Sequence, residues 1–250
     1  RNMIDTWFFI RYGDPRYHIR LRIKPKPLVY EQVENELRKM LGKVFRDRFT
    51  WDIKQETYMR EIQRYGDLNI TATEKLFQAD SEFMLGVLKT FNDGDLSSLR
   101  WKIAAISIHR LLDDFHVSLA ERVVIMKRLT ESFFAEQRVT SKVQISWLKD
   151  NFRSKKSELN NLLAGNDHTV LGFSPVLSVR SGKIRILTKK INKNLREEEL
   201  KLENILPSYL HMLMNRLFVS QHRRQEMIVY DLLHQHYAGA ENRAAHAGRS

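Results

Sequence analysis

WFFIRYGDPRYHIRLRIK, residues 7–24, is the most informative segment of the chain. Two apolar runs flank a Gly13-Asp14-Pro15 turn, which predicts a β-hairpin over residues 6–24. The second strand alternates with period two, so its side chains divide between two faces. One face carries Ile19, Leu21 and Ile23, and the other carries four basic residues: His18, Arg20, Arg22 and Lys24.

The basic face of this strand has two interpretations. Arginines two residues apart present parallel guanidinium forks, a geometry that suits bidentate binding of a carboxylate or a phosphate. Folding does not require four basic groups on one face, so Arg20 and Arg22 are candidate anion ligands. Alternatively, these side chains simply solvate the outer face of an edge strand. The strand alone does not choose between the two interpretations.

The composition is that of a folded protein with an anionic partner. The 250 residues are 42% hydrophobic and 29% charged, which is sufficient for a sizeable core. Lys and Arg number 42 against 30 Asp and Glu, and this formal charge of +12 favours nucleic acid, an acidic substrate or a membrane surface as partner. The charge does not choose among these three.

Several classes of protein are excluded. The chain has no cysteine, which excludes disulfides, Cys-ligated zinc or clusters, and thiol catalysis. No apolar run reaches about 18 residues and no signal peptide is visible, so we expect a cytoplasmic protein without a membrane span. Because the chain starts at Arg1 almost directly in a strand, we expect a segment of a longer protein or one half of a split protein.

After the hairpin, the pattern predicts one helix, one strand and then a helical body. Apolar residues have helical spacing over 29–46, whereas the β-prone residues 50–65 predict one long strand or two pieces of one. Further helices are expected at 72–90, 97–113, 118–136, 140–162, 190–203, 205–219 and 223–237. The fold class is therefore α+β, with a small N-terminal β-sheet and hairpin packed on a mainly helical C-terminal part.

Two segments are expected to lie outside this pattern. Residues 164–185, which contain three glycines and Pro175, predict the longest non-helical connection, either a mobile loop over a site or a plain linker. The small and polar tail, residues 239–250, is expected to be disordered or foreign to the native protein. Residues 1–238 would form one domain.

The standard signatures of nucleotide and zinc sites are missing. The sequence contains no GxGxxG, no Walker loop, no kinase motifs and no HExxH. The spacing of His109 and His116, or of His234 and His236, does not indicate a metal site, and we interpret these residues as core or surface imidazoles. The acidic run at 197–199 predicts a solvated helix face.

Two other segments carry candidate functional groups. In MREIQRYGD, residues 59–67, Glu61 and Arg64 lie at a glycine turn, although an exposed ion pair is the simpler interpretation. In the predicted helix PSYLHMLMNRLF, His211 lies one turn before Asn215, and a core histidine is the simpler interpretation.

Taken in order, these segments resemble the C-terminal domain of the lantibiotic dehydratases, also called the thiopeptide-type bacteriocin biosynthesis domain. Residues 8–24 match its FFIRYxDPxxHIRLRIK opening, and residues 61–66 match its E-x-x-R-Y-G motif. Its E-x-(I/L)-F-x-x-D-S element is matched by Glu74, Leu76, Phe77, Asp80 and Ser81. Its helix with a His followed by N-R-L is matched by His211, Asn215, Arg216 and Leu217. The family usually has a glycine at Asp67, and a strand and a helix before the opening motif, which are not visible here.

The resemblance implies a function. In this family a large N-terminal domain transfers glutamate from glutamyl-tRNA to Ser or Thr of a precursor peptide, and the C-terminal domain eliminates it to leave dehydroalanine or dehydrobutyrine. The chain would then be a lyase of lanthipeptide or thiopeptide biosynthesis. Its implied partners are the glutamylated ribosomal precursor peptide and a glutamylation domain or subunit. A second copy, forming a homodimer, is a further candidate partner.

The resemblance also implies the site residues. Arg20, Arg22 and Arg64 would hold the glutamyl carboxylates, and Glu61 and His211 would handle protons. Which of the last two removes the α-proton is left open. His18 and Lys24 are further candidates for substrate binding. A β-elimination of this kind needs no metal and no organic cofactor.

Two alternatives remain at this point. A thiopeptide pyridine synthase, from the same superfamily, joins two dehydroalanines in a formal cycloaddition and has no glutamate to hold. A non-catalytic basic module that binds tRNA or a leader peptide would have a broad basic surface and salt-sensitive affinity. The second alternative predicts that the strand arginines face outward, far from His211, whereas elimination predicts that all the site residues line one pocket.

Overall fold

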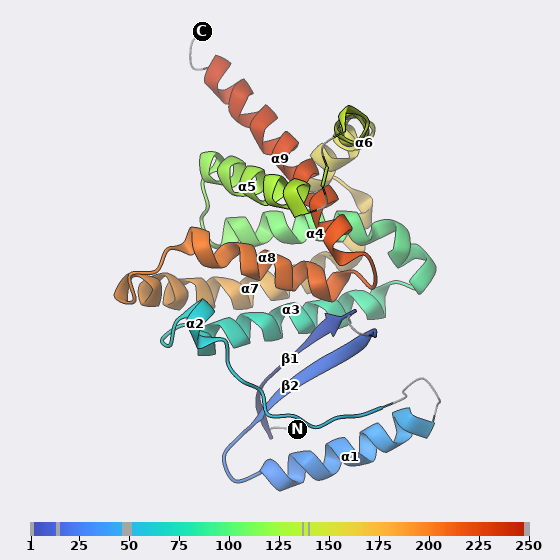
Figure 1. Ribbon diagram of the computed structural model, residues 1–250, viewed down its shortest axis with the longest axis vertical. Helices are drawn as coiled ribbons and strands as arrows, with labels where there is room; N and C mark the ends of the chain where they lie inside the picture. Colours follow the sequence, from blue (N-terminus) through green and yellow to red (C-terminus); the bar gives the residue numbers. More distant parts are fainter. Residues whose placement is uncertain (1–2, 14–15, 47–51, 137, 140, 248–250) are drawn as a thin grey trace.

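The computed structural model describes residues 3–13, 16–46, 52–136, 138–139 and 141–247. A β-hairpin lies between a stack of helices and the helix α1 (Tyr30–Arg46), which is the lowest element in Figure 1. This arrangement confirms the α+β fold class, with a small N-terminal sheet packed on a mainly helical body. The two strands are β1 (Ile4–Tyr12) and β2 (His18–Pro25), and they pair antiparallel as predicted.

Most of the predicted helices are present. Within the described residues the helices are α1 (Tyr30–Arg46), α2 (Ile62–Tyr65), α3 (Ile70–Thr90), α4 (Asp93–Asp114), α5 (Leu119–Glu136), α6 (Lys142–Leu163), α7 (His168–Glu197), α8 (Leu202–Leu217) and α9 (His222–Ala247). The core lies between α3, α4, α7, α8 and α9, and β1 packs on α3 and α8.

The predicted strand at 50–65 is wrong where the structure describes it. Residues 52–61 form an irregular segment, which is followed by the short helix α2; residues 50–51 lie outside the described residues. β-prone residues form a strand only when a neighbouring strand accepts their backbone hydrogen bonds. Here side chains hold the segment instead: Arg60 donates from Nε and Nη2 to the Glu74 carboxylate on α3, each at 2.8 Å.

The predicted connection at 164–185 is also wrong, because α7 runs through it with Pro175 inside the helix. Tertiary packing outweighs the local penalty of the proline and the glycines. Phe173, Leu177 and Ile184 are buried, and Gly86 on α3 allows Val176 to approach so closely that a Cβ there would lie 2.3 Å from its Cγ1. The helix ends at Glu197, not at 203 as predicted.

The last helix is longer than predicted. It continues to Ala247, so residues 239–247 are helical and the expected disorder from residue 239 is not found. The segment AENRAAHA consists mostly of good helix formers, and the buried Tyr237 anchors the preceding turn. Residues 248–250 lie outside the described residues.

The free edge of β1 is fastened to the helical body by polar side chains. Phe9 donates its backbone N–H to Ser81 Oγ on α3 at 3.2 Å. Arg11 donates its N–H to Asn215 Oδ1 at 2.8 Å and accepts from Asn215 Nδ2 at 2.7 Å. The Asn215 amide thus supplies the donor and acceptor that a third strand would supply.

Arg216, the neighbour of Asn215, lies inside the core. It is fully buried, its guanidinium stacks 4.9 Å from the centre of the Phe77 ring, and it donates to Ser81 Oγ at 3.2 Å and to the Met212 carbonyl at 2.7 Å. Burial lowers the pKa of Arg216 to about 10. The same Ser81 hydroxyl therefore contacts both β1 and α8, and it joins three elements at one point.

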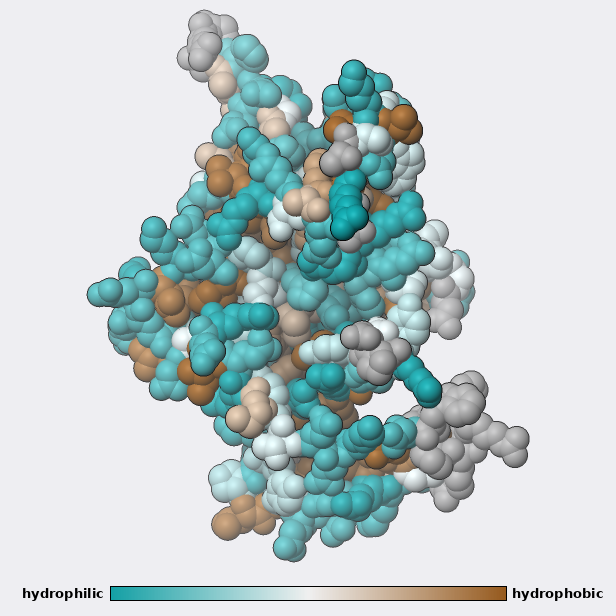
Figure 2. All heavy atoms as spheres, viewed as in Figure 1, coloured by the Kyte–Doolittle hydropathy of each residue, from teal (hydrophilic) through white to brown (hydrophobic). Residues whose placement is uncertain are grey.

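The exterior shows no sign of a membrane-crossing element. None of the helices in the described part of the chain has both the length and the apolar character needed to cross a membrane. On the face shown in Figure 2, hydrophilic residues predominate and hydrophobic ones form scattered groups.

We predict that Asn215→Ala destabilises the protein by about 1–3 kcal/mol, because it leaves the partly buried N–H and carbonyl of Arg11 without partners. Urea unfolding would measure the change. Asn161→Ala, at an exposed position of α6, is the matched control and should change the free energy of unfolding by less than about 0.5 kcal/mol. Equal effects of the two substitutions would show that Asn215 does not hold the strand.

Candidate active site

The basic face of β2 points toward buried groups, not toward open solvent. Arg20 pairs with Ile10 and Arg22 pairs with Phe8, so these residues share one face of the hairpin. Phe8 and Ile10 are buried, whereas Ile19 on the opposite face is 61% exposed. Arg20 and Arg22 are themselves half-buried, so they do more than solvate an outer face. The sheet docks by the edge of β1, which leaves this inner face beside the helical body.

Arg20 is held by two aromatic neighbours. Its guanidinium lies 3.9 Å from the centre of the Tyr12 ring, and its Nε donates to His18 Nε2 at 3.1 Å. His18 stacks on the same tyrosine, and its Nδ1–H donates to the Arg16 carbonyl at 2.8 Å. Because one ring nitrogen donates and the other accepts, this arrangement uses a neutral imidazole. His18 thus orients Arg20, and the terminal nitrogens of Arg20 have no partner among the described residues.

Arg22 has an unused hydrogen-bond donor. Its guanidinium lies 5.0 Å from the centre of the Tyr58 ring, and its Nε is buried without a hydrogen-bond partner in the described part of the chain. A buried charged donor without a partner is unfavourable, and an anion placed there would satisfy it. At the outer end of the same stripe, Lys24 pairs with Asp5 at 3.3 Å and is largely exposed.

Glu61, at the start of α2, and Arg64, within it, are linked to this face through Tyr58. They form an ion pair of 3.0 Å with both side chains substantially exposed. Half-buried Tyr58 lies between them and β2: burial, together with the negative charges of Glu74 and Glu61, raises its pKa to about 12, and the charge of Arg22 opposes this shift. Tyr58 is therefore within electrostatic reach of both Glu61 and Arg22.

His211 lies on the face of α8 that spans the two parts of the site. Ser208, His211 and Asn215 are spaced three and four residues apart and share one helix face. The hydroxyl of Ser208 shares a hydrogen bond of 2.7 Å with Tyr65 of α2, and Asn215 binds β1. His211 therefore lies between the point where α8 contacts α2 and the point where it contacts β1.

The His211 ring is oriented by an acid. Its Nδ1 lies 3.0 Å from both carboxylate oxygens of Glu226, a residue of α9 that is only 1% exposed. The His211 side chain is 37% exposed, so the other ring nitrogen can be reached from outside the core. The carboxylate holds the proton on Nδ1 and leaves Nε2 as the acceptor.

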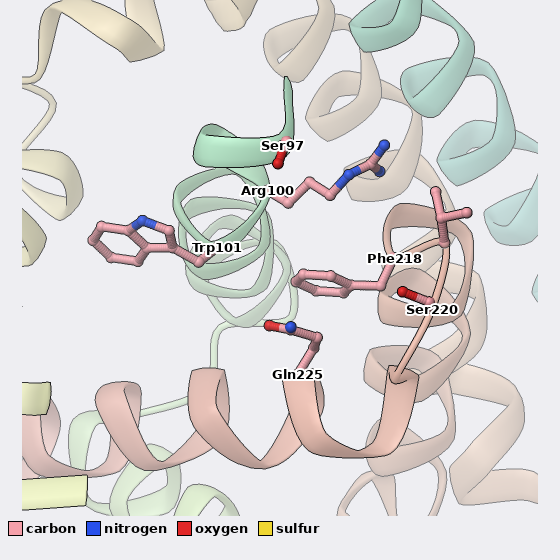
Figure 3. A pocket seen from close by; sticks show the side chains of 7 residues that line it. Ser97, Arg100, Trp101, Phe218, Ser220 and Gln225 are labelled. Carbon is pink, nitrogen blue, oxygen red and sulfur yellow. The ribbon is translucent and has the colours of Figure 1, made fainter. Parts of the chain in front are cut away.

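Of the five residues predicted to be catalytic, Arg20 and Arg22 share the inner face of β2, and Arg22 contacts Tyr58. Glu61 acts on Tyr58 through its charge and pairs with Arg64, so these four are linked through neighbouring groups. No direct contact between described residues joins His211 to any of the four. A pocket of ≈ 250 Å³ lies elsewhere, between α4 and the turn after α8, and none of the five residues borders it (Figure 3).

Sequence reasoning missed three residues of the site: Tyr12, Tyr58 and Glu226. Tyr12 could have been found, because closing the hairpin at residues 13–17 places it opposite His18. Tyr58 was assigned to a strand, and Glu226 comes from a different helix than its partner, so no local pattern indicated either. The described residues contain no cluster of three or more His, Asp or Glu able to hold a metal ion.

Comparison with known proteins identifies the family. The family model described as lantibiotic biosynthesis dehydratase C-term matches residues 1–237. The chain belongs to this family. The nisin biosynthesis protein NisB of Lactococcus lactis subsp. lactis is 26% identical over 240 residues, which are 92% of this chain and 22% of NisB. The subtilin biosynthesis protein SpaB of Bacillus subtilis is 29% identical over 122 residues, 48% of this chain and 12% of SpaB.

A solved structure shares the fold of this lantibiotic dehydratase C-terminal domain. The crystal structure of the tRNA-dependent lantibiotic dehydratase MibB from Microbispora sp. 107891 matches 96% of this chain with a TM-score of 0.73 and 20% identity. The match covers 25% of MibB. The chain thus spans a quarter or less of the length of each of these relatives.

We predict that His18→Leu frees the Arg20 side chain, because it removes both the acceptor of Nε–H and the ring stacked on Tyr12. Hydrogen exchange of the Arg20 Nε–H, followed by NMR, should accelerate roughly 3- to 10-fold, as expected for one lost hydrogen bond. The Arg11 Nε–H, which donates to the Arg216 carbonyl, is the internal control and should not change. Unchanged exchange at Arg20 would contradict a positioning role for His18.

Proposed function

We propose that this domain eliminates glutamate from glutamylated Ser or Thr residues of a ribosomal precursor peptide, leaving dehydroalanine or dehydrobutyrine. The observation that carries the proposal is the pair Arg20 and Arg22, oriented by aromatic rings and with donors that no described residue satisfies. Membership of the lantibiotic dehydratase C-terminal family supports the same reaction.

The reaction requires a base and a stabilised leaving group. A base removes the α-proton of the acylated residue, the electron pair forms the Cα–Cβ double bond, and the Cβ–O bond breaks to release glutamate as a carboxylate. Negative charge grows on the peptide carbonyl and on the departing carboxylate. Cations that are already oriented toward this charge stabilise the transition state without reorganisation.

We assign the residues as follows. Arg20 and Arg22 bind the free carboxylate of the glutamyl group and the carboxylate that departs. Arg64 supports them through Glu61, its ion-pair partner, whose charge acts on Tyr58. His211 Nε2 accepts the α-proton, because Glu226 holds the proton of Nδ1 and stabilises the imidazolium that forms. Glu61, paired with Arg64, remains the second candidate for handling protons. His18 contributes to substrate binding by orienting Arg20, and Lys24 contributes as the last cation of the basic face of β2.

We infer the partners from the reaction and from the fact that the chain matches only part of the length of its relatives. We propose that a glutamylation domain or subunit, using glutamyl-tRNA, supplies the substrate, because MibB is described as tRNA-dependent and this chain matches a quarter of it. Charged tRNA places the reaction in the cytoplasm. A homodimer stays a prediction that sedimentation of the purified chain would test.

We predict that Arg22→Ala and His211→Ala each reduce elimination about 10²- to 10³-fold, because one removes charge stabilisation and the other removes a base. The purified chain is given a peptide already glutamylated on Ser, and loss of glutamate is followed by mass spectrometry. With either variant the glutamylated peptide should accumulate.

Arg38→Ala is the matched control, since Arg38 is an exposed arginine on α1 that pairs with Glu34. It should leave the rate unchanged. Clean dehydration by both site variants, with circular dichroism equal to that of the parent chain, would show that the assignments are wrong.

We also predict that Glu226→Gln lowers kcat about 10- to 100-fold with little change in KM, because a neutral amide cannot stabilise the imidazolium. The pH profile of kcat should shift together with the rate. Glu197→Gln, an exposed position at the end of α7, serves as control. An unaltered pH profile would mean that Glu226 has only a structural role.

A further inference from the structure

Among the residues that the structure describes, one edge of the hairpin takes no part in the fold. Phe9 directs its backbone N–H away from β2, to Ser81. In an antiparallel pair this orientation alternates, so Phe8 and Ile10, the neighbours of Phe9, bond to β2. The residues opposite them, Arg22 and Arg20, bond back to β1. The residues of β2 whose N–H and C=O groups point outward are therefore Ile19, Leu21 and Ile23.

No described residue hydrogen bonds to these outward backbone groups, and the sheet has two strands in the part of the chain that the structure describes. The side chains of Ile19 and Leu21 are 61% and 46% exposed. An open edge with exposed apolar side chains is a template for another strand. Proteins that keep such an edge uncovered usually protect it by other means.

Basic side chains are one such protection, but they do not act in that way here. Charges prevent pairing when they project from the edge into solvent. Arg20 and Arg22 instead lie against the rings of Tyr12 and Tyr58, and the Nε of Arg22 is buried without a partner. The strand thus combines an open backbone edge with oriented cations on one of its faces.

We propose that the glutamylated segment of the precursor peptide binds to β2 as an additional strand. This inference rests on the proposed function, which makes an acylated peptide the substrate. A peptide residue opposite Arg20 or Arg22 would project its side chain to the same face, with Cβ atoms about 4.5–5.5 Å apart. A glutamyl group on that residue would then place its one free carboxylate, and the acyl group that leaves as a second carboxylate, against the two guanidiniums, a match of opposite charges.

This mode of binding would allow one site to act at many positions of the peptide. Main-chain hydrogen bonds do not depend on the peptide side chains, so any Ser or Thr in an extended segment can take the position opposite the arginines. The residues on either side of the acylated one fall on the other face, beside Ile19 and Leu21. We therefore expect faster elimination when these flanking residues are apolar.

The test measures binding of the full 250-residue chain to a synthetic peptide. In this peptide a diaminopropionate replaces the acylated Ser, so that the glutamyl group is held by an amide that cannot be eliminated. A series of such peptides carries a single backbone N-methyl group at successive positions around the acylated residue. Strand addition predicts a period-two pattern, in which methylation at alternate positions weakens binding about 3- to 10-fold and methylation between them does not.

Leu21→Pro provides the complementary change in the protein. It removes an outward N–H from the middle of the open edge and leaves the bonds between β2 and β1 in place. It should weaken binding about tenfold more than Leu21→Ala, which keeps the N–H. The N-methyl series uses the unaltered chain, so it decides the matter even if the proline variant does not fold.

A flat N-methyl series, or equal affinities of the proline and alanine variants when both are folded, would overturn the proposal and show that something else covers this edge. Elimination activity is measured in parallel with the eliminable ester. Activity without the period-two pattern refutes strand addition and keeps the proposed function. The period-two pattern without activity refutes the proposed function and keeps strand addition.

Discussion

The interaction on which the site depends is the attachment of one strand edge to two helices. The Ser81 hydroxyl and the Asn215 amide satisfy the backbone of β1 where a third strand would otherwise be required, and Arg216 adds a buried guanidinium that contacts the same hydroxyl. Buried polar groups cost free energy unless they are paired, so the arrangement tolerates little displacement. Because the sheet is held by the edge of β1, the outward backbone groups of β2 have no hydrogen-bond partner among the described residues.

The same attachment determines the electrostatics of the site. A guanidinium on an aromatic ring keeps its charge, loses conformational freedom and retains unused donors. Arg20 on Tyr12 and Arg22 on Tyr58 have this property, whereas Arg38 and Arg64 form ordinary exposed ion pairs that contribute little to stability. The cations that we propose for the anionic substrate thus differ from these exposed arginines in their surroundings. Net charge alone would not have identified them.

The motifs that indicated the family turn out to have two kinds of role. Glu74, Asp80, Ser81, Asn215 and Arg216 hold elements together: Glu74 fixes the segment before α2 through Arg60, and Asp80 forms a buried ion pair of 2.7 Å with Arg180 of α7. Arg20 and Arg22 lie on β2, Glu61 and Arg64 at α2, and His211 on α8, elements whose positions these contacts fix. A motif read along the chain cannot separate the two groups, because both consist of polar residues at fixed spacing.

Local periodicity was sufficient for the hairpin, the division of β2 into a basic and an apolar face, and most of the helices, because each of these depends on residues within a few positions of one another. It could not tell which face of β2 points inward, since that depends on hydrogen bonds between residues 204 apart in the chain. It failed at 52–61 and 164–185, where Tyr58, Arg60 and the close approach of α7 to Gly86 outweigh local propensity. The partner of His211 on α9 likewise arises from packing between helices, because no pattern within α8 contains it.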